Sequence, residues 1–424
     1  MRASAGIGLS MAGIDVSGND ASTHRSSISA SLECLEFDME FKIENVSPLG
    51  FGCMRFDGRE TNEIDIAYTR QMVKDYLDAG GNYFDTAWAY PNSEAALGEA
   101  LQGLDYDRES YFICSKCVTW THCESEEDLE RQLQESLANL QTDYLDMYLM
   151  HNLGGRRTAT FEKYHAWEFM KRAKERGLVR HIGFSAHCTP EELEEFCEKF
   201  PEAEVVQLQI NYLDWESPSF RERQCVEVAR KHGKPVIAME PVKGGLLANP
   251  SHAVREVLDE AFPNTGYAVD ALLFAASMPG VFCTLSGMNT LEQVRENAQA
   301  FKDFKPLSEQ QLEAIGRVQR IMGETHTVQC TGCEYCAKVC PENVGISRSL
   351  EVLNYYKNFG DPYAANYQLG FVVRFNGGKN MITDCIRCGA CEEACPQNLP
   401  ILSYFDEIER DVLPFSQKVV LMKP

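Results

Sequence analysis

The stretch SEEDLERQLQESLANLQTDYLDMYLMH, residues 125–151, holds one copy of the pattern that decides the fold. In residues 125–140 leucines recur at helical spacing, and residues 144–151 are a short apolar run typical of a buried strand. A helix followed directly by a buried strand is the repeating unit of a parallel sheet, because parallel neighbours need a crossover connection between them.

The same unit recurs on both sides of this stretch. Helical patterns also cover residues 64–80, 189–200 and 291–301, and the pattern at 189–200 begins with a capping box. Seven further apolar runs are typical of strands, at residues 47–52, 82–87, 111–116, 179–186, 205–210, 235–241 and 281–287. Eight strands and about eight helices in roughly 260 residues predict an α/β fold, a closed (β/α)8 TIM barrel. An open Rossmann sheet would place GxGxxG after an early strand, and the sequence has no such motif.

Three regions divide the chain. Residues 1–38 are rich in Ser, Gly and Ala without a clean period, which predicts a disordered N-terminal extension. Residues 39–305 form the predicted barrel. Residues 306–424 contain a predicted linking helix at 307–324, a weaker helical pattern at 348–360 and two cysteine clusters. Because this last region can bury little core by itself, we expect a metal cofactor to stabilise it.

Composition narrows the classes of partner and compartment. The 424 residues carry a net charge of −23, from 40 basic and 63 acidic side chains. This charge argues against nucleic acid, which needs a basic face, and against an anionic membrane surface. The longest apolar runs have the length of strands, so we expect no transmembrane segment and a cytoplasmic protein.

Seventeen cysteines are too many to be incidental, and they fall into two groups. Nine are scattered, mostly in apolar context, and we expect them to be reduced thiols in the core of a protein from a reducing cytoplasm. These nine are Cys34, Cys53, Cys114, Cys117, Cys123, Cys188, Cys197, Cys225 and Cys283.

Four polar residues stand at or just after consecutive predicted strands. Asp85 ends the second strand, Tyr90 follows in its loop, Lys116 ends the third strand and His151 ends the fourth. Each alone has an ordinary explanation, such as a helix cap, a rim aromatic, a solvated strand end or a core histidine. Because the carboxyl ends of barrel strands meet at the catalytic face, the joint pattern predicts an active site.

The chemistry of this set is that of a general acid. A phenol with a pKa of about 10 is a poor acid at neutral pH, and a cationic neighbour lowers that pKa. Lys116 can supply the charge, Asp85 can hold Lys116, and His151 can orient a carbonyl oxygen. The set therefore predicts protonation of a carbonyl, and it needs a separate hydride donor.

FDTAWAY (84–90), the strand-end Lys116, MH (150–151) and GFSAH (183–187) resemble the aldo-keto reductase superfamily. The resemblance covers roughly residues 39–305 and matches all four members of that family's catalytic tetrad. It implies that Tyr90 protonates the carbonyl oxygen of a small aldehyde or ketone while NADPH or NADH delivers hydride to the carbon.

The same resemblance implies the cofactor contacts. Ser185 and Gln209 would hold the carboxamide, and Lys243 in MEPVKGGLL (239–247) would contact the pyrophosphate. Within LSGMNTLEQVREN (285–297) the adenosine contacts would be Asn289, Gln293, Glu296 and Asn297. The residues that would border the nicotinamide and substrate pocket are Met54, Arg55 and Trp88.

Two departures from the family pattern concern the cofactor. Where many members grip a 2′-phosphate, this chain has Gly287, Met288 and Gln293, so NADP and NAD both stay open. Ala186 stands where an Asn is common, which removes one carboxamide hydrogen bond.

The pattern C-x2-C-x2-C-x3-C-P occurs twice near the C-terminus. The first run is Cys330, Cys333, Cys336 and Cys340 before Pro341, and the second is Cys385, Cys388, Cys391 and Cys395 before Pro396. Zinc sites usually split into two CxxC pairs across a longer loop, whereas four thiolates in one short run suit a 4Fe-4S cluster. Two such clusters are therefore favoured over zinc or a packing role.

The spacing also bears on ligand assignment. In the bacterial two-cluster pattern the fourth cysteine of each run binds the other cluster, which would exchange Cys340 and Cys395. The 44 residues between these runs exceed what a compact ferredoxin needs and favour a small, mostly helical ferredoxin-like domain. The whole combination resembles the iron-sulfur-containing members of the aldo-keto reductases.

The two halves leave three hypotheses. A nicotinamide passes two electrons as hydride, a 4Fe-4S cluster passes one, and the sequence shows no flavin signature. The favoured hypothesis is an NAD(P)H-dependent carbonyl reductase with structural or redox-sensing clusters. The alternative is an electron relay between a ferredoxin-type partner and the barrel site. A third, an interaction module on a barrel scaffold, is opposed by the intact tetrad.

Overall fold

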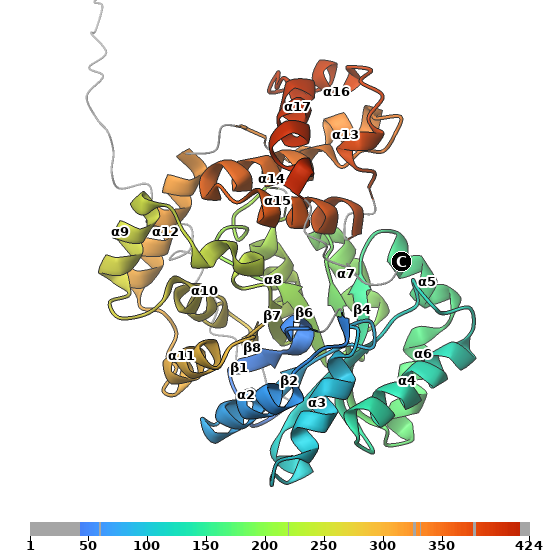
Figure 1. Cartoon of the computed structure of the whole chain (residues 1–424). Coiled ribbons are helices and arrows are strands. Elements are labelled where there is room, and N and C mark those ends of the chain that lie inside the picture. Colours follow the sequence, from blue (N-terminus) through green and yellow to red (C-terminus); the bar gives the residue numbers. More distant parts are fainter. Residues whose placement is uncertain are drawn as a thin grey trace, which may run out of the picture.

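The computed structural model describes residues 43–58, 61–218, 220–324, 328–330, 332–375 and 379–415. Within these ranges a barrel is capped at one end by a smaller helical domain (Figure 1). The expected extension at residues 1–38, with Cys34, lies outside the described residues.

Eight parallel strands form a closed barrel in chain order, which confirms the predicted fold class. Their bounds are β1 Leu49–Gly52, β2 Tyr83–Asp85, β3 Phe112–Cys117, β4 Leu145–Leu153, β5 Val179–Ala186, β6 Val205–Gln209, β7 Val236–Met239 and β8 Val281–Ser286. Each overlaps one predicted strand. The barrel closes where β8 pairs with β1, with Leu49 opposite Thr284.

Helices cover the outside of the barrel. They are α2 Ile66–Asp78, α3 Ser93–Gln102, α4 Glu126–Leu140, α5 Arg156–Lys163, α6 Ala166–Glu175, α7 Pro190–Lys199, α8 Glu222–Lys231, α9 His252–Ala261, α10 Tyr267–Ala276 and α11 Leu291–Phe301, with short turns η1 Cys53–Arg55, η3 Arg108–Ser110 and η4 Lys243–Ala248. The capping box of α7 forms as expected, with the Thr189 side chain accepting from the Glu192 amide. The β4–β5 and β7–β8 connections each carry two helices, so α5 and α9 exceed one helix per strand.

The barrel has an apolar layer inside and another between strands and helices. The inner layer includes Tyr83, Met147 and Ile237, and the outer layer is a larger cluster. All nine residues of β4 are buried, because one face of the strand meets the interior and the other meets helices. This double burial is why the strand appeared as a largely apolar run.

The scattered cysteines lie where the sequence predicted. Seven of them are buried, Cys188 is half-buried, and all of these thiols are free in the described part of the chain. No helix in the described ranges is long and apolar enough to cross a membrane.

The C-terminal domain is mostly helical and has its own apolar core. The helix α12 Glu309–Glu324 leads into this domain but packs its apolar side chains into the barrel core. The elements of the domain itself are α13 Tyr335–Val339, α14 Ile346–Phe359, α15 Pro362–Leu369, η5 Gly370–Phe375, η6 Ile382–Asp384, α16 Ala390–Glu393, α17 Ile401–Asp411 and η7 Leu413–Phe415. In Figure 1, α14 and α15 lie across the end of the barrel, and α13, α16 and α17 lie farther from it. Leu246, from η4 of the barrel, packs into the core of this domain.

Candidate active site and cysteine clusters

The four tetrad candidates meet at the carboxyl ends of β2, β3 and β4. Asp85 is the last residue of β2, Lys116 lies near the end of β3, and His151 lies in the second half of β4. Tyr90 follows β2 in a turn that its amide closes onto the carbonyl of Ala87 at 2.9 Å. The structure thus brings an acid, a phenol, an amine and an imidazole to one face.

Lys116 is the charged centre of the site. Its Nζ donates to Oδ1 of Asp85 at 2.6 Å and to the carbonyl of Thr86 at 2.7 Å, and it lies 5.5 Å from the ring centroid of Tyr90. Burial disfavours the ammonium, but the charges of Asp85 and Tyr90 outweigh it and raise the pKa of Lys116. Lys116 is therefore a buried cation beside the phenol.

Removing the Lys116 charge is expected to destabilise the fold. Lys116→Met leaves the Asp85 carboxylate buried without its partner, which typically costs about 3–5 kcal/mol. Urea unfolding of the two proteins measures the loss. Lys74→Met, which breaks an exposed ion pair on α2, is the matched control and is expected to change stability little. Equal losses of stability in the two variants would contradict the expectation that the buried Asp85 carboxylate depends on its lysine partner.

His151 faces Tyr90 as a neutral imidazole. Their ring centroids are 5.4 Å apart in an edge-on arrangement. Burial, followed by the charge of Lys116, lowers the pKa of His151 well below its ordinary value. Among the described residues its buried Nδ1 has no hydrogen-bond partner. A neutral ring with an unused nitrogen suits a polar substrate atom better than it suits a packing role.

Two tryptophans follow the strands that carry the tetrad, and one of them contacts it. Trp88 donates to Oε2 of Glu135 at 2.8 Å and packs on His122 with centroids 6.2 Å apart. Trp120 lies 6.1 Å from the His151 ring and donates to its backbone carbonyl at 3.2 Å. Trp88 was expected near the pocket, whereas Trp120 was missed. Its signal was its position shortly after the end of the third strand.

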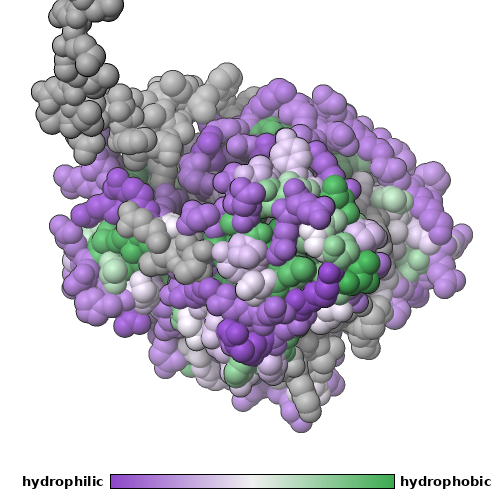
Figure 2. Space-filling model, turned by 90° about the horizontal axis from the view of Figure 1, so that it is seen from above, coloured by the Kyte–Doolittle hydropathy of each residue, from purple (hydrophilic) through white to green (hydrophobic). Residues whose placement is uncertain are grey.

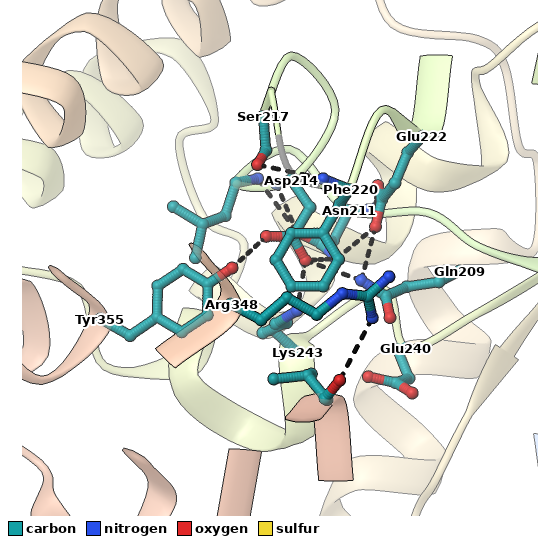
Figure 3. A network of polar contacts seen from close by, with 12 residues as sticks. Gln209, Asn211, Asp214, Ser217, Phe220, Glu222, Glu240, Lys243, Arg348 and Tyr355 are labelled. Carbon is teal, nitrogen blue, oxygen red and sulfur yellow. Dashed lines mark hydrogen bonds and ion pairs between the residues drawn. The ribbon is translucent and has the colours of Figure 1, made fainter. Parts of the chain in front are cut away.

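Lys243, the residue assigned to the pyrophosphate by resemblance, is engaged inside the protein. It is fully buried and forms an ion pair with Asp214. Its Nζ lies 4.2 Å from the ring centroid of Phe220 and 5.2 Å from that of Tyr355. Tyr355, from α14, donates to the other carboxylate oxygen of Asp214 at 2.5 Å (Figure 3). The lysine charge is therefore already matched by a carboxylate held from two sides.

The two carboxamide candidates are also occupied by internal contacts. Gln209 Nε2 donates to Asp214 at 2.7 Å and to Glu222 at 2.8 Å. Ser185 is buried, and its hydroxyl accepts from the Asn152 amide at 2.8 Å. Both side chains would have to give up these internal hydrogen bonds before they could bind a nicotinamide carboxamide.

The adenosine candidates lie in a different environment. Asn289, Gln293 and Glu296 are exposed at the start of α11, and the Asn289 amide donates to the Gln293 side chain at 2.8 Å. Asn297 is buried and donates to Ser286 at 3.0 Å. Three of the four adenosine candidates are therefore accessible to a ligand.

The two pocket-border residues near β1 differ in exposure. Met54 is half-buried, and Arg55 is exposed. The Arg55 guanidinium lies over the ring of Tyr367 from α15, 5.3 Å from its centroid. As arranged, the carboxamide and pyrophosphate residues do not fit a dinucleotide, because their polar atoms face protein groups, whereas the adenosine residues stay accessible.

Glu351 of α14 is a further titratable group beside the Asp214–Lys243 ion pair. Burial, helped by the charge of Asp214 and opposed by Lys243, raises the pKa of Glu351 to about 7. A carboxyl whose pKa is raised on folding contributes stability that is present below its unfolded pKa of about 4.3 and is lost as pH rises through 7.

We therefore expect urea unfolding to show falling stability between pH 5 and pH 8, with Glu351→Gln removing part of that decline. Glu313→Gln, at an exposed position of α12, is the control and should leave the slope unchanged. Identical slopes in all three proteins would show that Glu351 does not titrate in this range.

The eight clustered cysteines surround two separate hollows. The first is lined by Cys330, Cys333, Cys336 and Cys395, and the second by Cys340, Cys385, Cys388 and Cys391. The structure thus places the fourth cysteine of each run with the other run. In the described residues no three His, Cys, Asp or Glu side chains lie close enough to hold a single metal ion. Four thiols spread around a hollow suit the larger 4Fe-4S cluster.

Comparison with known proteins assigns both parts of the chain. Residues 48–320 match the aldo/keto reductase family, and residues 329–399 match the 4Fe-4S dicluster domain. An uncharacterized oxidoreductase, YqkF of Bacillus subtilis, is 24% identical over 64% of this chain and 92% of its own length. D-galacturonate reductase of Fragaria ananassa is 29% identical over 67% of this chain and 90% of its own length.

Solved structures agree on the barrel. The aldo-keto reductase AKR11C1 from Bacillus halodurans, in its holo form, has a TM-score of 0.53 at 25% identity, covering 64% of this chain and 92% of its own. A Klebsiella pneumoniae aldo/keto reductase in complex with NADP and acetate has the same fold, with a TM-score of 0.53 at 23% identity over 65% of this chain and 92% of its own. The chain is therefore an oxidoreductase of the aldo/keto reductase family that carries a 4Fe-4S dicluster domain after its barrel.

Proposed function

We propose that this protein reduces the carbonyl group of a small aldehyde or ketone, with Tyr90 as the general acid and NADPH or NADH as the reductant. The observation that carries the proposal is the buried Lys116–Asp85 pair beside the Tyr90 ring, with neutral His151 on the ring's edge. The NADP-bound Klebsiella pneumoniae relative supports a nicotinamide as the reductant.

The proton half of the reaction follows from this chain's own side chains. When Tyr90 gives up its proton, the Lys116 ammonium stabilises the resulting phenolate, and Asp85 keeps that ammonium in place. His151 can donate to the carbonyl oxygen and hold it toward Tyr90. Trp120, which packs on His151, would limit access of water to the proton transfer.

A bound nicotinamide would supply the hydride that these residues lack. In this structure the polar atoms of the carboxamide and pyrophosphate candidates face protein groups and do not fit one, whereas the proton transfer needs only side chains of this chain. The exposed residues of the adenosine end are the part of the site that fits as it stands.

For the C-terminal domain we propose two 4Fe-4S clusters, one in each hollow. Cys330, Cys333, Cys336 and Cys395 would hold the first, and Cys340, Cys385, Cys388 and Cys391 the second. Bound clusters would supply one-electron redox chemistry and cross-links for a small core.

A second candidate function is electron relay to a ferredoxin-type partner. Cys333 and Cys388 are exposed, and three of the exposed large hydrophobic residues lie in the same two cysteine runs. They are Tyr335, Val339 and Ile386, at 53%, 46% and 60% exposure. Figure 2 looks down on the molecule from this side and shows small hydrophobic areas among hydrophilic residues. Apolar side chains beside exposed cluster ligands favour contact with a redox partner.

One anaerobic experiment tests the proposal and separates the candidates. NADPH and then NADH are added to reconstituted protein, with and without a simple aldehyde, while cluster absorbance and EPR are followed. Aldehyde reduction with clusters that stay oxidised is the expected result. Cluster reduction by the nicotinamide would favour the relay, and no aldehyde turnover with either nucleotide would refute carbonyl reduction.

A further inference from the structure

We propose that the C-terminal domain is a lid on the cofactor site, meaning the residues assigned above to the nicotinamide cofactor. Its α14, α15 and η5 cover the carboxamide and pyrophosphate half, the adenosine half stays open, and a nicotinamide dinucleotide binds fully only when the lid lifts. The inference rests on the proposed use of NADPH or NADH.

The first lid contact is polar and buried. Tyr355 of α14 donates to Asp214 at 2.5 Å, and the same carboxylate pairs with Lys243 and accepts from Gln209 at 2.7 Å. Tyr355 is itself fully buried. Helix α14 therefore holds Asp214 in place through Tyr355. Asp214 in turn pairs with Lys243, the one lysine among the cofactor candidates.

The second lid contact covers the neighbouring loop. Gln368 of α15 lies against Gly244, where an added Cβ would be 3.2 Å from its Nε2. Phe371 of η5 packs edge-on against His187, with ring centroids 5.4 Å apart, beyond the end of β5. Leu246 of η4 lies in the core of the C-terminal domain. The contact thus reaches from β5 to the loop after β7.

Charge explains why a dinucleotide and the closed lid compete. Around Lys243 lie the carboxyl groups of Asp214, Glu222 and Glu351, all buried. The Asp214 carboxylate already pairs with the Lys243 ammonium, so a pyrophosphate can contact that ammonium only after Asp214 moves away. Because Tyr355 binds Asp214, that movement requires α14 to shift.

The exposed adenosine candidates imply an order in which the two ends of a dinucleotide bind. Asn289, Gln293 and Glu296 are exposed at α11, so an adenosine group can bind there while the lid is closed. The nicotinamide end would follow only after the lid contacts break. The affinity for a dinucleotide should therefore depend on the lid contacts, and the affinity for an adenosine fragment should not.

The test compares NADPH with adenosine 2′,5′-bisphosphate by titration calorimetry on the full-length, cluster-loaded protein. Tyr355→Phe removes the hydrogen bond to Asp214, and Phe371→Ala removes the packing on His187. Each variant is expected to bind NADPH about three- to tenfold more tightly than the unaltered protein, with the fragment's affinity unchanged. Tyr363→Phe is the control within the lid helix α15, because that exposed ring contacts Phe415 of the same domain.

Hydrogen exchange gives a readout besides affinity. NADPH is expected to lower protection over residues 243–248 and 362–375 in the unaltered protein, and the fragment is not. Equal NADPH affinity in all four proteins, with no change in exchange, would overturn the lid while leaving carbonyl reduction standing. Failure of every variant to bind NADPH, and NADH in a parallel titration, would overturn the lid and the proposed cofactor together.

Discussion

Tyr90→Phe is expected to lower the rate of aldehyde reduction by about 10²- to 10⁴-fold. The ring keeps its place between Lys116 and His151, but the proton that the carbonyl oxygen needs is gone. The measurement is single-turnover reduction at saturating nucleotide, where product release does not limit the rate. Nucleotide affinity should stay the same, because only the phenolic oxygen is removed.

Tyr83→Phe is the matched control for this change. Its hydroxyl also lies inside the barrel, where it donates to the sulfur of Met147 at 3.3 Å and, within the described part of the chain, forms no hydrogen bond with a member of the tetrad. We expect it to keep most of the activity. Full activity in the Tyr90 variant would make the tetrad a structural feature and favour the relay function of the C-terminal domain.

The second large effect concerns the crossed arrangement of the cysteine runs. Cys330 and Cys395 line one hollow although they belong to different runs, and Cys340 lines the other. The double variant Cys330→Ser/Cys395→Ser should therefore lose about half of the iron, the same as either single variant. The double variant Cys330→Ser/Cys340→Ser should lose nearly all of it, because both clusters are then missing a ligand.

Iron content and the EPR signal of the reduced clusters measure these losses. Uncrossed ligation predicts the reverse, with the Cys330/Cys340 pair losing half and the Cys330/Cys395 pair losing nearly all. Cys197→Ser is the control, since this buried thiol lies in α7 of the barrel. A serine that still binds iron weakly would blur the result of a single variant. It affects both double variants alike, so their comparison stays informative.

Most of the barrel could be predicted from local pattern. β4 is buried at every position, so its largely apolar run, interrupted by Asp146, was easy to identify. The capping box at Thr189 marked the start of α7 to the residue. The extra helices α5 and α9 could not be predicted in the same way, because a connection of any length can carry one or two helices outside the barrel without changing strand order.

The tetrad is another case in which position along the chain was sufficient. Parallel strands in a barrel all present their carboxyl ends on one side, so polar residues that end consecutive strands must be neighbours. Asp85, Lys116 and His151 followed from this rule, and Tyr90 from its short loop. Trp120 did not, because a loop residue can turn toward the site or away from it.

By itself, the sequence determined the eight strands, the order of the polar strand ends and the two cysteine runs, since each depends on residues close in the chain. Only the tertiary structure decided what covers the barrel mouth. Asp214 and Tyr355 are 141 positions apart and meet at 2.5 Å, and no local spacing encodes that distance. Long-range pairing depends on how two apolar cores pack against each other, and this packing buried the lysine that the sequence had assigned to a ligand.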